Sequence, residues 1–93
     1  MAHEPELEWT PLAVKSLEQV LARIAQDNPA AAQRFARRVK QKTEQLRQYP
    51  ALGKAAHNKR RILLVHPNYQ LTYRVTDQAV EILNIRHVAR KPK

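Results

Sequence analysis

Two helix-start signals, separated by the length of one helix, constrain this chain more than any other feature. Thr10-Pro11 and Asn28-Pro29 each place a capping side chain directly before a proline. A hydroxyl or amide oxygen suits the N-cap, and proline suits the first helical position because its missing N–H has no partner there anyway. The first helix should therefore end near Asp27, where the second signal begins. Two helices joined by so short a break form an antiparallel hairpin.

Both predicted helices carry an apolar stripe with steps of three and four residues. In the first helix the stripe consists of Val14, Leu17, Val20, Leu21 and Ile24. In the second helix, which should run from Pro29 to about Tyr49, the stripe consists of Ala32, Phe35, Val39, Leu46 and Tyr49, with Thr43 filling a gap. Such stripes usually face the protein's own core, and we expect the same here.

The remainder of the chain predicts strands. A short strand over 6–9 should precede the first helix, and a basic loop over 54–61 should follow the second. Three strand patterns then follow closely: an apolar run over 61–66 that is typical of a strand covered on both faces, an alternating segment over 69–75, and a last strand over 79–86. The predicted order is β-α-α-β-β-β, an α+β fold with an N-terminal helical hairpin packed on a small antiparallel sheet. The sequence does not predict which strand of the sheet the first strand pairs with.

Length and composition restrict the class of protein. Ninety-three residues form one domain, in which we expect residues 1–5 and 91–93 to be flexible. The absence of cysteine excludes disulfides, thiol chemistry and the usual structural zinc sites, and we expect neither a metal nor a cofactor. The acidic start is unlike a secretory signal, and no apolar run approaches the roughly 18 residues of a membrane span. These features predict a cytoplasmic protein with no membrane contact.

Charge is distributed unevenly along the chain, whose formal net charge is +9. Residues 1–30 hold two basic and five acidic side chains, a net −3, whereas residues 31–93 hold fifteen basic and three acidic ones, a net +12. Such a field attracts polyanions and acidic proteins over long range. The partners that it favours are nucleic acid, a nucleic-acid machine or an acidic inhibitor segment. The alternative is a soluble basic protein without such a partner.

Several motifs, in order, resemble the RelE/ParE superfamily of toxins from type II toxin–antitoxin systems. Leu-Glu-Trp-Thr-Pro-Leu-Ala at 7–13 is similar to their opening, and Asp-Asn-Pro-Ala-Ala-Ala at 27–32 to their interhelical turn. Arg-Ile-Leu-Leu-Val-His-Pro-Asn-Tyr at 61–69, followed by Tyr-Arg-Val at 73–75, resembles ParE-like members most closely. Ile-Arg-His-Val-Ala-Arg at 85–90 resembles their C-terminal ending. The resemblance covers about residues 6–91 and implies the same β-α-α-β-β-β fold.

The ParE resemblance implies a toxin that inhibits growth by binding a replication target, DNA gyrase, and that a cognate acidic antitoxin neutralises. It also implies a toxin–antitoxin hetero-oligomer in which the antitoxin wraps the hairpin and the sheet. Four residues are candidates for bordering an antitoxin groove: Leu12, Val20, Ala36 and Leu46.

The RelE branch of the superfamily implies the alternative, a ribosome-dependent mRNA endoribonuclease. Its chemistry needs a base for the ribose 2′-hydroxyl, cations for the phosphate and an acid for the leaving oxygen. Arg61, Arg86 and His87 are the catalytic candidates. No tyrosine lies near the C-terminus and no carboxylate lies between Glu44 and Asp77, so the set is incomplete and favours ParE. Whether the chain is an enzyme stays open, and a third possibility is a decayed toxin that only binds its antitoxin.

Two cationic clusters are candidates for contact with the target, and we expect both at the same end of the sheet. Their members are Lys59, Arg60, Arg61, Arg86, His87 and Arg90. The alternative is that they are solvated faces of the protein. His66 stands directly before a proline turn, where we expect it to stabilise the turn.

Overall fold

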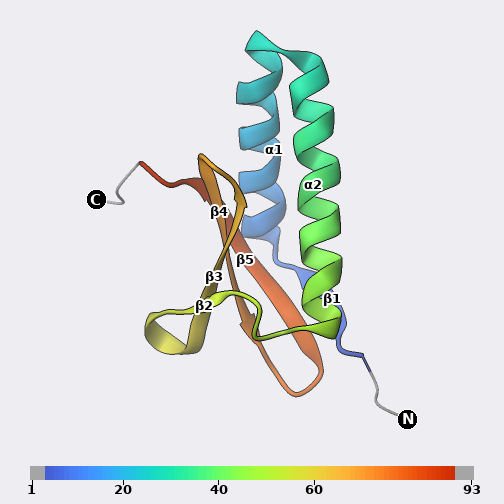
Figure 1. Cartoon of the computed structure of the whole chain (residues 1–93), viewed down its shortest axis with the longest axis vertical. Coiled ribbons are helices and arrows are strands. Elements are labelled where there is room, and N and C mark those ends of the chain that lie inside the picture. Colours follow the sequence, from blue (N-terminus) through green and yellow to red (C-terminus); the bar gives the residue numbers. More distant parts are fainter. Residues whose placement is uncertain (1–3, 90–93) are drawn as a thin grey trace.

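The structure, a computed structural model, describes residues 4–89 and confirms the predicted α+β order (Figure 1). Its elements are β1 (Glu6–Trp9), α1 (Pro11–Asp27), α2 (Pro29–Gln48), β2 (Lys54–Ala55), the 3₁₀ turn η1 (His57–Lys59), β3 (Arg60–His66), β4 (Tyr69–Val75) and β5 (Ala79–His87). The segment that the sequence predicted as a loop therefore contains a two-residue strand and a turn. Such short elements leave no periodic pattern in the sequence.

Both helices begin where their capping signals predicted. The Thr10 hydroxyl accepts a hydrogen bond from the Ala13 N–H at 3.1 Å, and Asn28 Oδ1 accepts one from the Ala31 N–H at 3.1 Å. α2 ends one residue before Tyr49, whose side chain is 63% exposed instead of joining the stripe. The two helices lie side by side, and their connection extends beyond the sheet (Figure 1).

The sheet is mixed, which corrects the prediction of an antiparallel one. Its strand order is β1-β5-β4-β3-β2, and β1 pairs in parallel with β5, from Glu6 opposite Ala79 to Trp9 opposite Ile82. The other three pairings are antiparallel. Parallel neighbours need a long crossover connection, and the helical hairpin supplies part of it. Helix and strand patterns alone carry no information about this direction.

β1 ends opposite Ile82, and beyond this point the N-terminal part of α1 lies against β5. The Thr10 hydroxyl donates to the Ile82 carbonyl oxygen at 3.0 Å, and the Ser16 hydroxyl accepts from the Ile85 N–H at 3.0 Å. The Ser16 side chain thus satisfies a backbone N–H of β5 that lies beyond the end of β1 and has no partner there. This attachment fixes α1 against the C-terminal half of β5.

The core lies between the helical hairpin and one face of the sheet (Figure 1). Its least exposed large side chains are Val39, Thr43, Leu46, Val65, Leu71, Tyr73, Val80 and Ile82. Thr43 fills the gap in the α2 stripe as predicted, and its hydroxyl donates to the Val39 carbonyl oxygen at 2.9 Å. The prediction that 61–66 is covered on both faces is wrong, since Leu64 is 56% exposed. Only the face towards the helices is covered.

Candidate functional site

The two predicted cationic clusters lie at opposite ends of the sheet, so the expectation of one common patch is wrong. β3 and β5 both pair antiparallel with β4, and they therefore run in the same direction. Arg61 is the second residue of β3 and lies level with Ile82, whereas Arg86 lies near the end of β5. Four residues of extended chain separate Ile82 from Arg86, about 13 Å. Arg61 and Arg86 therefore do not form one patch at a single end of the sheet.

Arg61 has a structural partner at its end of the sheet. Its Nη1 donates to the Gly53 carbonyl oxygen at 2.7 Å, which ties the loop after α2 to β3. Tyr73 ties the same loop to β4: its hydroxyl donates to the Pro50 carbonyl oxygen at 2.6 Å and accepts from the Gly53 N–H at 2.8 Å. Burial raises the pKa of the Tyr73 hydroxyl. We call Pro50, Gly53, Arg61 and Tyr73 the loop latch.

Gly53 is essential to the loop latch because of its close approach to Tyr73. A Cβ atom on residue 53 would lie 2.7 Å from the Tyr73 ring, 2.8 Å from its hydroxyl and 2.9 Å from the Ile62 carbonyl oxygen. Only a residue without a side chain brings the loop backbone this near to the sheet. The single glycine of the chain is thus explained by packing.

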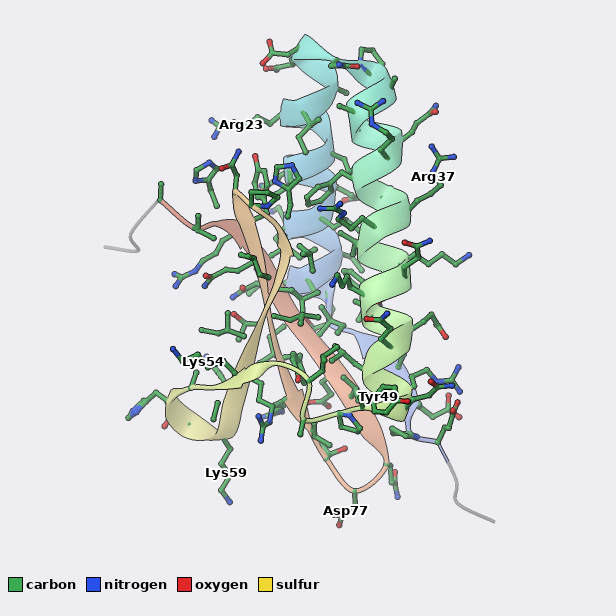
Figure 2. The ribbon with its side chains drawn as sticks, in the orientation of Figure 1. Arg23, Arg37, Tyr49, Lys54, Lys59 and Asp77 are labelled. Atoms are coloured by element: carbon green, nitrogen blue, oxygen red, sulfur yellow. The ribbon has the colours of Figure 1, made fainter. Side chains whose placement is uncertain are left out.

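Lys59 and Arg60 lie beside the loop latch and are exposed. Asn58 and Lys59 both have positive φ angles, 61° and 59°, and the Arg60 N–H donates to the His57 carbonyl oxygen, as in the tight turn of a β-hairpin. Lys59 points away from the molecule at the end opposite Arg23 (Figure 2). Arg90, the remaining predicted target contact, lies outside the described residues.

A cluster of four rings occupies the other end of the sheet. Tyr69 is buried at its centre, with ring centroids 5.1 Å from His87, 5.2 Å from Phe35 and 5.8 Å from His66. Phe35 comes from α2, and the other three rings come from β3, β4 and β5. The structure thus places His87 beside His66, a neighbour that sequence reasoning did not pair with it.

Both histidines of this cluster act as hydrogen-bond acceptors at Nδ1. His66 Nδ1 accepts from the Asn68 N–H at 3.0 Å, which confirms its predicted role in the turn, and His87 Nδ1 accepts from the Ala89 N–H at 3.1 Å. A neutral ring whose Nδ1 accepts a hydrogen bond carries its proton on Nε2. Burial, and then the positive charges of Arg38 and His87, lower the pKa of His66 and favour this neutral form.

A groove of about 930 Å³ runs between the end of the helical hairpin and the β3–β4 turn. Arg23 from α1 and Arg34 and Arg38 from α2 line it together with the ring cluster. A second hollow of about 440 Å³ continues along α2, where Arg38 and Lys42 face Leu64 and the β3–β4 turn. We call the two together the hairpin groove.

Sequence reasoning missed the cations of the hairpin groove because it considered only the basic clusters at 59–61 and 86–90. The signal was nevertheless present. Arg34, Arg38 and Lys42 are spaced by four residues, and side chains at this spacing share one helix face.

The four predicted antitoxin contacts differ in accessibility. Leu12 is 62% exposed, and Ala36 is half-buried. Leu46 is 0% exposed and belongs to the core, so the prediction that it borders a groove is wrong. Val20 also belongs to the core, but it lines a shallow hollow of about 540 Å³ beside Arg86 and His87. Residues on an apolar stripe face the chain's own interior first.

Residues 4–89 contain neither a candidate membrane span nor a cluster of metal-binding side chains. No helix in this range is long and apolar enough to cross a membrane. No three side chains of histidine, aspartate or glutamate within it gather closely enough to hold a metal ion.

The sequence model of the ParE toxins of type II toxin–antitoxin systems (parDE) matches residues 7–92. The chain belongs to the ParE toxin family. This ParE-family toxin is 42% identical over 82 residues to a protein of Caulobacter vibrioides named toxin RelE2, an alignment that covers 88% of this chain and 93% of the relative.

Solved structures confirm the RelE/ParE-like fold. The toxin superposes on a chain of the chromosomal ParDE system of P. aeruginosa with a TM-score of 0.80 and 21% identity, covering 94% of this chain and 99% of that one. A chain of the E. coli DinJ–YafQ toxin–antitoxin complex gives a TM-score of 0.64 and 14% identity, with coverages of 94% and 96%.

Proposed function

We propose that this ParE-family toxin stops growth by binding a protein of the replication machinery, in the first place DNA gyrase, and that it does not cleave RNA. A cognate acidic antitoxin neutralises it in the cytoplasm. The observation that carries the proposal is the hydrogen bonding of the two histidines, each of which uses Nδ1 to accept a backbone N–H.

A histidine in this state is a poor general base. A neutral ring bonded in this way holds its proton on Nε2, and protonation of Nδ1 would break the hydrogen bond from the Asn68 or Ala89 N–H. A general base must instead present a free lone pair to the 2′-hydroxyl. Arg61 is also unsuited to catalysis, because its guanidinium is bound to the loop and far from His87. The groups that remain at this end of the sheet are hydrogen-bond donors and cations, and such groups suit binding of an acidic protein surface better than acid–base catalysis.

Of the predicted target contacts, we assign the role to Arg86 and His87. They lie at the end of the sheet where the hairpin groove adds Arg23, Arg34 and Arg38 to the local positive field. Clustered charges of one sign accelerate encounter with an acidic surface. Lys59 and Arg60 lie at the opposite end and serve as a comparison.

Proteins with this fold support the assignment of an antitoxin partner. One structural neighbour comes from a ParDE toxin–antitoxin system and another from the DinJ–YafQ complex. The net charge of +12 on residues 31–93 suits an acidic partner.

Induced expression in bacteria, with thymidine and methionine incorporation followed in parallel, tests the proposal. DNA synthesis should fall before protein synthesis, and the purified toxin should then inhibit gyrase supercoiling. Arg86→Ala should weaken both effects, whereas Arg60→Ala, the same change at the other end of the sheet, should alter them little. An earlier fall of translation would overturn the proposal.

The ribonuclease remains the second candidate because the ring cluster brings two histidines and Arg38 to one groove. Cleavage of ribosome-bound mRNA, reduced by about 10²-fold or more in His87→Ala, would establish it. Absence of both effects in cells that accumulate folded toxin would instead favour a decayed toxin.

A further inference from the structure

We propose that the face of the sheet opposite the helical hairpin is the contact surface for a second copy of this chain, which forms a two-fold dimer with aligned strands. The inference goes beyond the proposed function, which assigns to this face no role other than that of Arg86. Three features of the face support it: no layer covers it, its charges are ordered by sign, and that order is complementary to itself.

The open face of the sheet is the one that the helical hairpin does not cover, and no helix or strand within residues 4–89 lies on it (Figure 1). Side chains that are paired across a ladder share one face, as do those two residues apart along a strand. Arg74 and Glu81 are such a pair, with Arg74 Nε 2.6 Å from Glu81 Oε1. They lie on the open face, because the adjacent pair, Tyr73 and Ile82, is buried in the core.

The charges of the open face are ordered by sign across the sheet. Glu8 of β1 lies level with Glu81 of β5, so the acidic side chains are neighbours. Arg60 of β3 lies opposite Arg74 of β4, so the basic side chains are neighbours as well. We call these four residues the charge row, which reads in strand order Glu8, Glu81, Arg74 and Arg60.

Only the middle of the charge row is neutralised within residues 4–89. The ion pairs in this range are the one between Arg74 and Glu81 and two that involve Arg47 of α2. Glu8 and Arg60 are exposed at the two ends, three strand spacings or about 14 Å apart. Glu6 of β1 and Lys54 of β2, both exposed, extend the acidic and the basic side of the same face. The open face therefore has one acidic and one basic half.

A two-fold axis that lies in the interface and runs along the strands reverses the order of the charge row. Glu8 of each copy then faces Arg60 of the other, and Glu81 faces Arg74. Stacked sheets lie about 10 Å apart with their strands within about 30° of each other, a gap that glutamate and arginine side chains bridge from opposite sides. Because the interface is isologous, each contact occurs twice. An axis across the strands would instead place like charges opposite each other.

Other classes of partner match only half of the open face. Nucleic acid or an acidic protein surface that binds the basic half is repelled by the acidic half, and a basic surface meets the reverse problem. Arg86 also lies on this face, opposite Gln70. Four residues, or about 13 Å, separate Gln70 from Arg74, so Arg86 lies outside the charge row. A second copy supplies both signs in the required order.

Sedimentation equilibrium of the purified full chain at low salt tests the inference. We expect a monomer–dimer equilibrium with a dissociation constant on the order of 10–100 µM, since each exposed ion pair contributes little. Raising the ionic strength from about 0.02 to about 0.5 M should weaken the dimer about tenfold or more, because salt screens exposed charges. A monomer at every concentration up to about 1 mM would overturn the inference.

Charge reversals localise the contact. Glu8→Lys and Arg60→Glu should each weaken self-association about tenfold or more, because each change places like charges opposite each other at two symmetric sites. An equimolar mixture of these two variants should form a heterodimer within about threefold of the wild-type affinity, since the introduced lysine of one faces the introduced glutamate of the other.

Matched controls make the same two changes on the helical hairpin. Glu18→Lys and Arg37→Glu replace exposed residues, of which Arg37 points away from the sheet, and each should change the affinity less than about threefold (Figure 2). Circular dichroism of all four variants controls for folding, which changes at exposed positions should not disturb.

Three further results would contradict the inference. They are undiminished association of Glu8→Lys and Arg60→Glu, equal losses in the two hairpin variants, and failure of the mixture to recover the dimer. All of these measurements use the toxin alone, without gyrase and without a readout of toxicity. The inference and the proposed function can therefore fail independently of each other.

Discussion

The two ends of the sheet contain similar types of residue, arginines and aromatic rings, but their polar groups differ in how far they are hydrogen-bonded within the protein. At one end Arg61 and Tyr73 are bonded to backbone groups of the loop 50–53. At the other end His66 and His87 are anchored at Nδ1 only, and Arg34 and Arg38 form no ion pair within residues 4–89. Arginine and aromatic residues therefore stabilise the fold where their polar groups are satisfied internally. Where their hydrogen-bond donors have no partner among the described residues, the same residue types line an open groove.

Gly53→Ala should produce the largest loss of stability. It most directly tests whether the loop latch stabilises the fold. The added Cβ lies within 3 Å of Tyr73 and of the Ile62 backbone, so loop or strand must shift. Overpacking of this kind costs roughly 1–3 kcal/mol, and loss of the hydrogen bonds to Tyr73 adds to it. Urea unfolding measures the change, with Ala51→Ser in the same loop as a control near zero. A wild-type stability for Gly53→Ala would mean that the loop is not held as described.

Tyr73→Phe should follow, with a loss of about 1–3 kcal/mol, because it leaves the buried Gly53 N–H and the Pro50 carbonyl oxygen without their partner. Tyr49→Phe removes a hydroxyl from an exposed ring and should change the free energy of unfolding by less than about 0.5 kcal/mol. Thermal unfolding of the pair provides the comparison. Similar losses in both variants would contradict the role given to the Tyr73 hydroxyl.

Arg61→Ala sharpens the distinction between structure and binding. We expect a loss of about 1 kcal/mol from the bond to Gly53, and no larger fall in toxicity than this loss of folded protein explains. Arg60→Ala, at the exposed neighbouring position, should change stability by less than about 0.5 kcal/mol. Growth inhibition at equal levels of folded protein is the readout. Toxicity lost without any change in stability would return Arg61 to the candidates for target contact.

The smallest expected effect is a pH dependence at the ring-cluster end. The pKa of His66 is lowered in the folded protein, so the unfolded chain binds the proton more readily. Its contribution to stability is therefore present above the ordinary histidine pKa of about 6.5 and is lost as the pH falls through the lower folded value. His66→Gln should flatten the fall in stability between pH 7.5 and 5, while His57→Gln, in the exposed turn η1, should leave it unchanged. Equal curves for wild type and His66→Gln would show that the ring is not held neutral.

Local signals in the sequence determined the helices and most of the strands. The two caps at Thr10 and Asn28 fixed the hairpin because capping depends on groups within four residues of each other. The alternation over 69–75 placed Tyr69, Leu71 and Tyr73 on the buried face, since side chains of a strand alternate between its two faces. The order of motifs also identified the RelE/ParE superfamily.

Contacts between distant residues were decided only by the tertiary structure. The parallel pairing of β1 with β5, the separation of Arg61 from Arg86 and the meeting of Arg38 with His66 all depend on strand direction and register. A residue's type and its immediate neighbours do not encode these relations, because they arise from how the hairpin and the strands pack together. For this reason the sequence alone specified the family, the two helices and the longer strands, whereas packing decided which cations hold the fold together and which line a groove.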